Sequence, residues 1–377
     1  MTSGKDRCPW TWSIQGPVAC TICLVGIICN SLALFSLHRL NEQNAAGLLL
    51  RVLGTSDLAY VTLHFLGVAV PSLASVDFTG DRGRIVYGLL EPLSRIALGI
   101  TTWVTVLLAY HRFTAASRVE IVNIRKQLKF IKIQVAVVTI LSCLLHIPRF
   151  FEYDFFQSAE PCSNRSNFDV IFSQNITRNL QIPYSCVYQL KDYQKYYSLL
   201  VYSMIFNGIP LCSLLVLTIR LIYSLHRKKR LLHRQLSNQS QRSYSLEKQV
   251  TGLCILVCVI SLLCNTPAIL YKIMRTVELA EEFTALNQLL ACTYSYRIMR
   301  ETTIVLFLIN SSVNFFVYFS MSKKFRRALL CKAYRPVDMS DSFEHRKDKN
   351  METRMSHDER ITSECERVSG EDEELPQ

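Results

Sequence analysis

Residues 304–320 read IVLFLINSSVNFFVYFS, an apolar run that carries polar side chains in its second half. Polar groups in hydrocarbon are costly, so within a membrane span they normally face the protein interior and mark function. The run leads into SKKFRRALLCK, residues 322–332, a short basic amphipathic stretch that includes Cys331. Such a polar-cored span followed by a basic surface helix indicates a membrane switch, and we expect no enzymatic activity. The polar side chains of the run are Asn310, Ser311, Ser312, Asn314 and Tyr318.

The whole chain is divided into seven apolar segments separated by charged stretches. Each segment is near or above the ~20 residues that cross a hydrocarbon core of about 30 Å. This segregation of charge fits an integral membrane protein better than a soluble domain. We therefore predict an all-α membrane protein, a bundle of seven transmembrane helices with a short amphipathic cytoplasmic helix. The predicted spans are 17–38, 46–74, 84–111, 131–151, 197–222, 250–273 and 300–320.

Basic residues cluster in the segments that follow spans one, three, five and seven, whereas the opposite loops are poorer in basic residues for their length and carry several acidic ones. The positive-inside rule then places the N-terminus outside the plasma membrane and the C-terminus in the cytosol. The net charge of +12 reflects this topology and contact with anionic lipid, not nucleic-acid binding. We predict an extracellular N-terminus (1–15), a receptor domain that includes helix 322–332 (16–333) and a disordered cytoplasmic tail (334–377).

The long loop between spans four and five carries two glycosylation motifs, at Asn164 and Asn175. Four cysteines fall on the predicted outer side, an even number that suggests two disulfides, with three pairings open. We favour Cys162 with Cys186 and Cys8 with Cys292.

A buried carboxylate at mid-span is the main candidate for a functional site. Asp57 lies in the middle of span two, and a lone carboxylate in a membrane is a functional hypothesis by default. Hard oxygen ligands suit a small cation, so we predict a polar cluster that holds Na⁺ in one state and loses it in another. The alternative is a protonated Asp57 that is hydrogen-bonded to Asn30. The predicted partners of Asp57 are Asn30, Thr101, Asn310, Ser311 and Asn314.

Arg112 follows a long apolar stretch at the inner end of span three. Glu247 begins span six on the same side of the membrane and could pair with Arg112. The alternative for Arg112 alone is a side chain that snorkels to the interface. Three prolines interrupt spans and predict kinks about which a helix can swing, namely Pro148, Pro210 and Pro267.

Taken in chain order, these features resemble the rhodopsin-like family of G-protein-coupled receptors, over about residues 15–333. The features are Asn30, Asp57, Arg112, Pro210, the motif Cys264-Asn-Thr-Pro267, the motif Asn314-Phe-Phe-Val-Tyr318 and the basic segment with Cys331. Within that family, His146-Ile-Pro-Arg-Phe-Phe-Glu152 and Asn310-Ser-Ser-Val-Asn-Phe-Phe look most like the FMRFamide-type neuropeptide receptors of invertebrates.

The resemblance implies a role for each matched residue. Asp57 and its partners match the family's sodium pocket, and Arg112 matches the arginine that contacts the G protein. Asn314 and Tyr318 match the switch motif of the last span. Cys331 matches a palmitoylation site, which its position beside a basic amphipathic helix allows.

The chain departs from the family pattern at five positions. His111 replaces the acidic residue before the arginine, which would hold Arg112 less firmly and raise basal activity. Asn265 replaces the tryptophan of span six, Phe315 the proline of the last span and Thr218 the tyrosine of span five. Tyr87 stands near the place of the usual span-three cysteine, so the family's usual disulfide cannot form.

Charged residues at the outer ends of the spans suggest where a ligand binds. These are Glu91, Arg95, Arg149, Glu152, Arg300 and Glu301. They predict either salt bridges among themselves or a pocket for a short peptide, whose Arg-Phe-amide end would suit Glu91, Glu152 or Glu301. Aromatic contacts below would come from Trp103, Tyr202, Phe206 and Tyr271.

The resulting hypothesis is a receptor for a short amidated neuropeptide that activates a heterotrimeric G protein by a population shift. Arrestin and receptor kinases would terminate the signal. Two rival readings are a receptor-like protein with altered or lost coupling and an ion- or proton-conducting seven-span protein.

Overall fold

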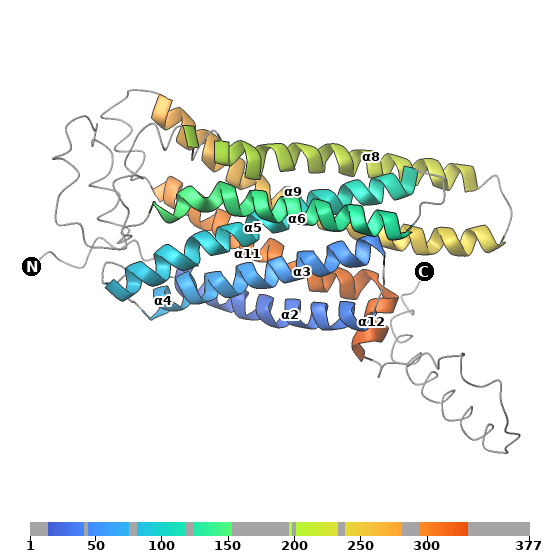
Figure 1. Cartoon of the computed structure of the whole chain (residues 1–377), viewed down its shortest axis with the longest axis horizontal. Coiled ribbons are helices and arrows are strands. Elements are labelled where there is room, and N and C mark those ends of the chain that lie inside the picture. Colours follow the sequence, from blue (N-terminus) through green and yellow to red (C-terminus); the bar gives the residue numbers. More distant parts are fainter. Residues whose placement is uncertain are drawn as a thin grey trace, which may run out of the picture.

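The computed structural model describes residues 14–40, 44–74, 81–117, 124–152, 196–197, 201–232, 238–280 and 294–330. Within these ranges the chain is almost entirely helical, and no strand occurs among the described residues. Seven of the described helical segments are long and apolar enough to cross a membrane (Figure 1). The prediction of a seven-helix membrane bundle is therefore confirmed.

The first three spans run from residue 16 to residue 117. The π-helical turn η1 (Ile14–Val18) leads into α2 (Ala19–Arg39). The second span is α3 (Ala45–His64), which continues through the π-helical turn η2 (Phe65–Ala69) and α4 (Val70–Leu73). The third span lies in α5 (Asp81–Ser117), which extends beyond the predicted segment at both ends.

The remaining spans are α6 (Ile124–Phe150), η5 (Met204–Gly208) with α8 (Ile209–Leu232), α9 (Asn238–Ala280) and α11 (Tyr294–Met321). The cytoplasmic helix predicted at 322–332 is α12 (Lys323–Leu330). Pro210 is the second residue of α8 and lies just beyond the π-helical turn η5, and such a wider turn can accommodate the backbone carbonyl that proline leaves without a donor. Pro267 lies inside α9, which is continuous across it.

Hydroxyl side chains within the spans bond back to the helix that carries them. Thr105 donates to the Thr101 carbonyl at 2.8 Å, and Ser312 donates to the Leu308 carbonyl at 2.7 Å. In hydrocarbon there is no water to satisfy such groups, so a carbonyl one turn earlier is the nearest acceptor. This local bonding lets serines and threonines occupy spans without a partner from another helix.

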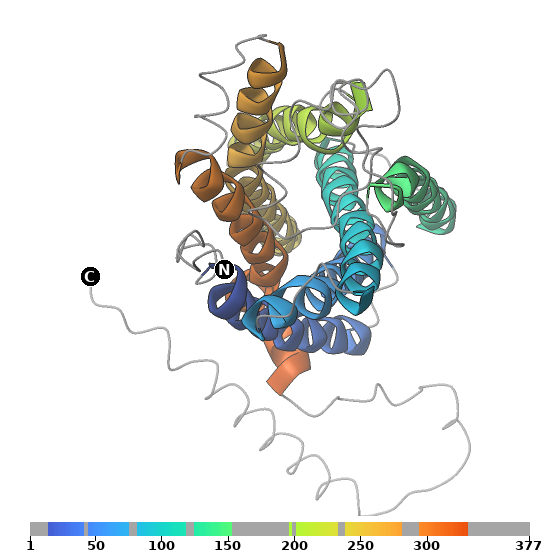
Figure 2. The same cartoon turned by 90° about the vertical axis from the view of Figure 1, so that its left-hand side faces the viewer.

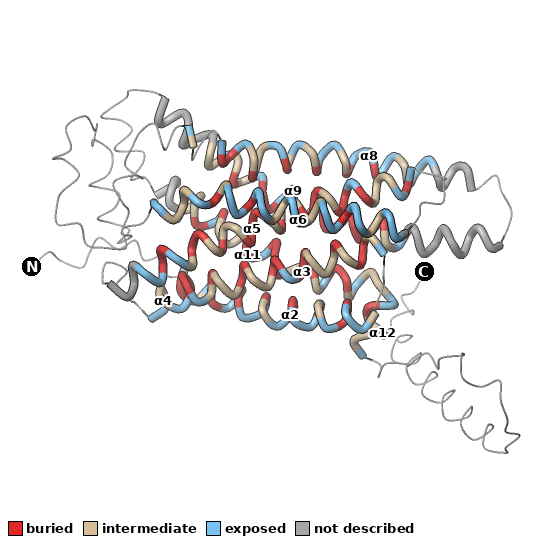
Figure 3. Tube along the Cα trace, viewed as in Figure 1, coloured by how far each residue is buried: buried red, intermediate tan, exposed pale blue. Residues whose placement is uncertain are grey.

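The helices form a ring when viewed along the bundle (Figure 2). The central spans, on α3 and α5, each have 56% of their most apolar window buried, whereas the span on α6 has 17%. α6 therefore lies at the rim and presents an apolar outer face that includes Ile133, Val137 and Leu144 (Figure 3). Lipid chains can cover that face.

Two apolar clusters fill the bundle, one on each side of its middle. The inner cluster includes Leu53, Leu108 and Phe325, which brings α12 into the same packing as α3 and α5. The outer cluster includes Val61 and Leu308.

Candidate functional site

Asp57 lies at the centre of a hydrogen-bonded node that joins three helices. The carboxylate is fully buried on α3. Thr101 on α5 donates to Asp57 Oδ1 at 3.0 Å, and Asn314 on α11 donates through Nδ2 to Asp57 Oδ2 at 2.7 Å. The Thr101 hydroxyl also lies 2.9 Å from Ser56 Oγ. Hydrogen bonds to a buried carboxylate are strong, so the node fixes the rotation of all three helices about their axes.

Asn30 and Ser311 extend the node toward α2. Asn30 Nδ2 donates to the Ser311 carbonyl at 2.8 Å. The Ser311 hydroxyl lies near Asp57 but makes no hydrogen bond of normal length. Asn30 Oδ1 also lacks a hydrogen-bond partner within the described part of the chain. Two side-chain oxygens of this cluster, Asn30 Oδ1 and Ser311 Oγ, thus have no hydrogen-bond partner among the described residues.

Asn310 has a different neighbour from the one that its spacing predicts. Its Oδ1 accepts from Ser261 Oγ on α9 at 3.0 Å, and Asn265 Nδ2 donates to the Ser261 carbonyl at 2.6 Å. The amide of Asn310 therefore joins α11 to α9, whereas the amide of Asn314 joins α11 to α3. Sequence reasoning missed Ser261, although it lies one helical turn before Asn265 in the same span.

At the end of the bundle that the sequence predicts to face the cytosol, His111 is paired with Gln134 and not with its neighbour Arg112. His111 Nε2 lies 2.7 Å from Gln134 Oε1 on α6. Within the described residues, no carboxylate lies within 4.0 Å of Arg112, and Arg112 Nε has no hydrogen-bond partner. The side chain of Glu247, the predicted partner, lies outside the described residues, although its backbone belongs to α9.

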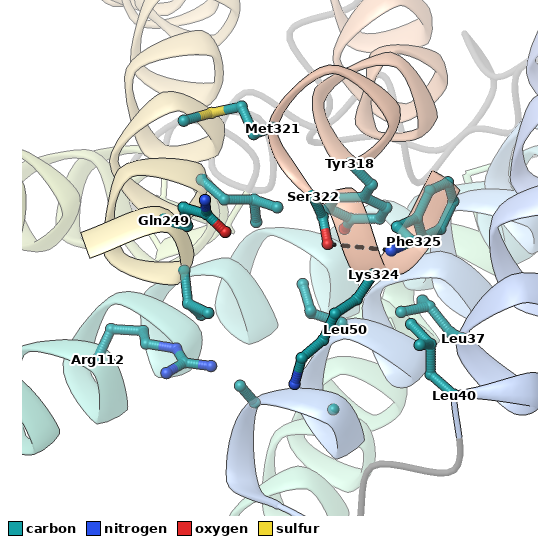
Figure 4. A pocket seen from close by; sticks show the side chains of 14 residues that line it. Leu37, Leu40, Leu50, Arg112, Gln249, Tyr318, Met321, Ser322, Lys324 and Phe325 are labelled. Atoms are coloured by element: carbon teal, nitrogen blue, oxygen red, sulfur yellow. Dashed lines mark hydrogen bonds between the residues drawn. The ribbon is translucent and has the colours of Figure 1, made fainter. Parts of the chain in front are cut away.

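Arg112 instead faces a cavity of about 110 Å³. Helices α2, α3, α5, α9, α11 and α12 surround the cavity (Figure 4). Tyr318 lines the same cavity, and its buried hydroxyl has no hydrogen-bond partner among the described residues. Tyr318 thus lies between the Asp57 node and the arginine.

At the opposite end, which the sequence predicts to be outside, the six charged residues include three ion pairs between neighbours on the same segment of chain. Arg95 Nε lies 2.7 Å from Glu91 Oε1 on α5, and Arg149 lies 3.0 Å from Glu152 Oε2 at the end of α6. Arg300 and Glu301 on α11 are farther apart, at 3.9 Å. All three carboxylates are buried. The sequence predicted either salt bridges or a ligand pocket; the structure shows local ion pairs in a buried charged layer, and the ligand pocket stays a prediction.

The aromatic floor of this layer is built around Tyr202. The Arg149 guanidinium lies 4.1 Å from the centre of the Tyr202 ring, and the Lys272 ammonium lies 5.3 Å from it. His146 contacts the rings of both Tyr202 and Phe206, at 5.2 and 4.5 Å between ring centres. Arg149 and Lys272 therefore place two cations against one aromatic ring.

His146 and Phe206 can approach α5 because residue 99 is glycine. A Cβ atom at Gly99 would lie 2.8 Å from Phe206 Cε1 and 3.1 Å from His146 Cε1. His146 is fully buried and bonds the Ser142 carbonyl at 2.6 Å. His146 belongs to a motif noted in the sequence, but it was not among the residues predicted for the site. Trp103 lies elsewhere, in an apolar cluster with Val106 and Leu214.

Residues 83–331, about two thirds of the chain, match the model of the family described as serpentine type 7TM GPCR chemoreceptor Srw. The chain belongs to this family. It is a seven-transmembrane G-protein-coupled receptor and a multi-pass membrane protein. A search of curated proteins gave no match.

The match begins within α5, so it covers Arg112, Asn314 and Tyr318 but not Asn30 or Asp57. The receptor's first two spans are placed by the structure itself. The hydrogen bonds from Thr101 and Asn314 to Asp57 tie the second span to the matched region.

Several predicted features of the receptor lie outside the described residues. They are the four outer cysteines Cys8, Cys162, Cys186 and Cys292, the glycosylation motifs at Asn164 and Asn175, and Cys331. The eight cysteines described in the spans are free thiols.

Proposed function

We propose that the chain is a rhodopsin-like receptor of the plasma membrane that binds an extracellular peptide and activates a heterotrimeric G protein. The observation that carries this proposal is the Asp57 node. It joins α3, α5 and α11 between the charged outer layer and the cavity beside Arg112. The helices that the Asp57 hydrogen bonds hold together also line the cavity beside Arg112. A ligand that shifts one of these helices would therefore change both the hydrogen bonds and the shape of the cavity.

The ligand is a short peptide with a cationic, amidated end, as in the FMRFamide-type receptors that the sequence resembles. Glu301 is the proposed anchor, because its carboxylate is buried on α11 within the charged layer, 3.9 Å from Arg300. A guanidinium from the ligand can form two charge-assisted bonds to a carboxylate. Phe206 and Tyr202 form the aromatic wall below.

Na⁺ fits the Asp57 node in the inactive state. The node offers one carboxylate together with the orphan oxygens Asn30 Oδ1 and Ser311 Oγ. An all-oxygen donor set suits a hard cation. Thr101 and Asn314 hold the carboxylate in place, and loss of the ion would leave a charge whose burial favours rearrangement of the node.

Signalling is a shift between two populated arrangements of the helices. Agonist favours the arrangement without Na⁺, in which α9 swings about Pro267 and widens the cavity beside Arg112. A G-protein helix then docks in the widened groove. Arrestin and receptor kinases act on the same cytosolic face, and an acyl chain on Cys331 anchors the end of α12.

The test is a panel of amidated peptides applied to cells that express the receptor, with calcium and cyclic AMP as readouts. One peptide should give a saturable response, and Glu301→Gln should raise its half-maximal concentration by roughly 10-fold or more. Thr302→Ala is the matched control, because Thr302 is exposed on the same helix turn.

A second reading, a receptor-like protein with altered coupling, is favoured by one observation. His111 pairs with Gln134 where an acidic residue would restrain Arg112. Silence toward every peptide, with surface expression verified, would favour that reading. A ligand-independent current abolished by Asp57→Ala would instead favour an ion-conducting protein.

A further inference from the structure

The first turns of α6 carry four basic side chains, at the end of the bundle that is predicted to face the cytosol. All four are exposed, namely Arg125, Lys126, Lys129 and Lys132. Lys129 and Lys132 form no ion pair with any residue that the structure describes. Because they are three positions apart on a helix, they are neighbours on one face, with Cβ atoms about 5–6 Å apart. One anionic group can therefore contact both.

The acidic side chains that could balance this charge lie elsewhere in the described part of the chain. Helix α6 contains no acidic residue. The carboxylates whose side chains the structure describes are Asp57 in the node and Glu91, Glu152 and Glu301 at the opposite end of the bundle. Like charges on successive turns of one helix repel each other. This end of α6 is therefore suited to an anionic partner from outside the chain.

Exposed apolar side chains alternate with these cations. Phe130 is 55% exposed and Ile133 is 61% exposed, and each directly follows one of the two lysines. Only 17% of the most apolar window of α6 is buried, so the helix lies at the rim of the bundle (Figure 2). Large apolar side chains are stable on such a surface where lipid covers them. Lys129 and Lys132 therefore lie where the hydrocarbon begins, and their ammonium groups reach toward the lipid headgroups.

The exposed apolar face continues along α6 toward the middle of the membrane. It includes Val137, Ile140 and Leu144. From Lys132 to Leu144 the helix rises about 18 Å, similar to the ~15 Å of one hydrocarbon leaflet. A cationic patch that leads into an apolar face of this length matches a phospholipid, in which a charged headgroup is joined to acyl chains. A soluble anion would match only the patch.

We propose that Lys129 and Lys132 form a binding site for the headgroup of a phosphoinositide, whose acyl chains lie along the exposed apolar face of α6. Arg125 and Lys126 add positive charge at the same level. A headgroup with several phosphates is favoured, because clusters of basic residues beside a membrane span attract multiply charged lipids. The site depends on the membrane bundle alone and not on the peptide ligand or on G-protein coupling.

The test uses the full-length receptor in phosphatidylcholine nanodiscs that contain a small fraction of phosphatidylinositol bisphosphate with a photoreactive acyl chain. Crosslinks should map to residues 129–144. Lys129→Gln and Lys132→Gln should each lower the yield of these crosslinks by roughly fivefold, whereas Lys129→Arg and Lys132→Arg should retain it. Arg220→Gln is the matched control, because Arg220 is an exposed cation within the span on α8 and has no basic neighbour within one turn.

Three outcomes would overturn the site. An equal loss of the α6 crosslinks in Arg220→Gln would mean that only the overall charge of the receptor attracts the lipid. Crosslinks that map to other helices and not to α6 would refute the location. Unlabelled phosphatidylserine that competes as well as unlabelled phosphatidylinositol bisphosphate, at equal total lipid charge, would refute a site for a multiply phosphorylated headgroup.

Binding at this site has a consequence for the neighbouring helix. Gln134, two residues after Lys132, lies 2.7 Å from His111 on α5. A bound headgroup would hold this end of α6 in place, so phosphatidylinositol bisphosphate should raise the Tm of the receptor by a few degrees. The rise should vanish when both lysines are replaced by Gln and should persist in Arg220→Gln. A rise that persists without the lysines would refute the site, whereas crosslinking without a rise would support binding and refute the restraint on α6.

Discussion

At the scale of single residues, the buried carboxylate of Asp57 is stabilised by the hydrogen bonds through which it joins three helices. Its two carboxylate oxygens accept from helices on different sides of the bundle, through Thr101 and Asn314. A buried carboxylate with fewer donors would be destabilising. Two further oxygens of the cluster, Asn30 Oδ1 and Ser311 Oγ, have no hydrogen-bond partner in the part of the chain that the structure describes. The node therefore supports the three helices, and the two oxygens without described partners are the basis of the proposal that it binds a cation.

Asp57→Ala tests both parts of this description. It leaves the Asn314 amide without its acceptor, which should lower the free energy of unfolding by about 1–3 kcal/mol in detergent-solubilised receptor. It should also abolish any dependence of agonist affinity on Na⁺ concentration. Thr55→Ala is the control, because the exposed Thr55 hydroxyl bonds only the Arg51 carbonyl. Sodium dependence retained in Asp57→Ala would exclude the cation site.

A second residue-scale prediction concerns His111. Its ring is held by Gln134 at 2.7 Å and leaves Arg112 without a carboxylate among the described residues. His111→Asp should supply that carboxylate and lower ligand-independent signalling by roughly fivefold, since a charge-assisted pair would hold Arg112 in the inactive arrangement. His111→Asn adds no charge and should have little effect. Equal changes in the two variants would show that loss of the Gln134 contact, and not a new ion pair, is responsible.

At the scale of elements, α11 and α12 are joined by rings and by backbone caps. Phe325 of α12 is buried between Phe315 and Tyr318 of α11, at 5.9 and 5.8 Å between ring centres. Arg326 donates to the Phe319 and Ser320 carbonyls at the end of α11. These carbonyls lack partners within the helix, so the arginine caps it. The orientation of α12 is therefore coupled to that of the last span.

Phe315 stands where the switch motif that this span resembles has a proline, and the structure suggests how proline would be tolerated. A proline at 315 would leave the Ser311 carbonyl without its helical donor, yet Asn30 already donates to that carbonyl at 2.8 Å. At each position, the free energy of unfolding of the proline variant is compared with that of the alanine variant. The loss from alanine to proline should be about 1 kcal/mol smaller at position 315 than at position 316. Thermal denaturation of the four variants measures this difference. Equal differences would mean that Asn30 gives no compensation.

At the scale of the whole molecule, the charge pattern and the bundle determine different things. The bundle has the same seven spans whichever way it is inserted, and only the loops distinguish the two sides. The predicted outer side carries the Asn164 and Asn175 motifs, and the predicted inner side carries α12 and Arg112. Orientation therefore governs which end binds ligand and which end couples.

Glycosidase treatment tests the orientation. In receptor from eukaryotic cells, Asn164→Gln and Asn175→Gln should each lower the apparent mass by the mass of one glycan. The double variant should show no further mass change when it is treated with glycosidase. A tag after residue 377 should be accessible to antibody only in permeabilised cells. Antibody binding at the tail of intact cells would reverse the assignment of the two faces.

The sequence by itself determined the class of fold and the set of polar residues. Span length and hydropathy are local quantities, so seven membrane helices could be predicted within a few residues at most ends. The basic amphipathic pattern likewise placed the helix observed at Lys323–Leu330. The sequence marked Asp57, Asn310 and Asn314 as candidate functional residues, because a polar side chain in hydrocarbon costs free energy wherever its helix lies.

Only the tertiary structure decided which of these residues meet. Asn310 and Asn314 are one turn apart and differ by about 40° around the helix. This difference is enough for Asn310 to bond Ser261 on α9 while Asn314 bonds Asp57 on α3. Neighbouring helices likewise decided that His111 contacts Gln134 and that His146 and Phe206 lie against Gly99. The reason is that a residue's neighbours across a bundle depend on the rotation and depth of separate helices, and no local pattern in one helix encodes those.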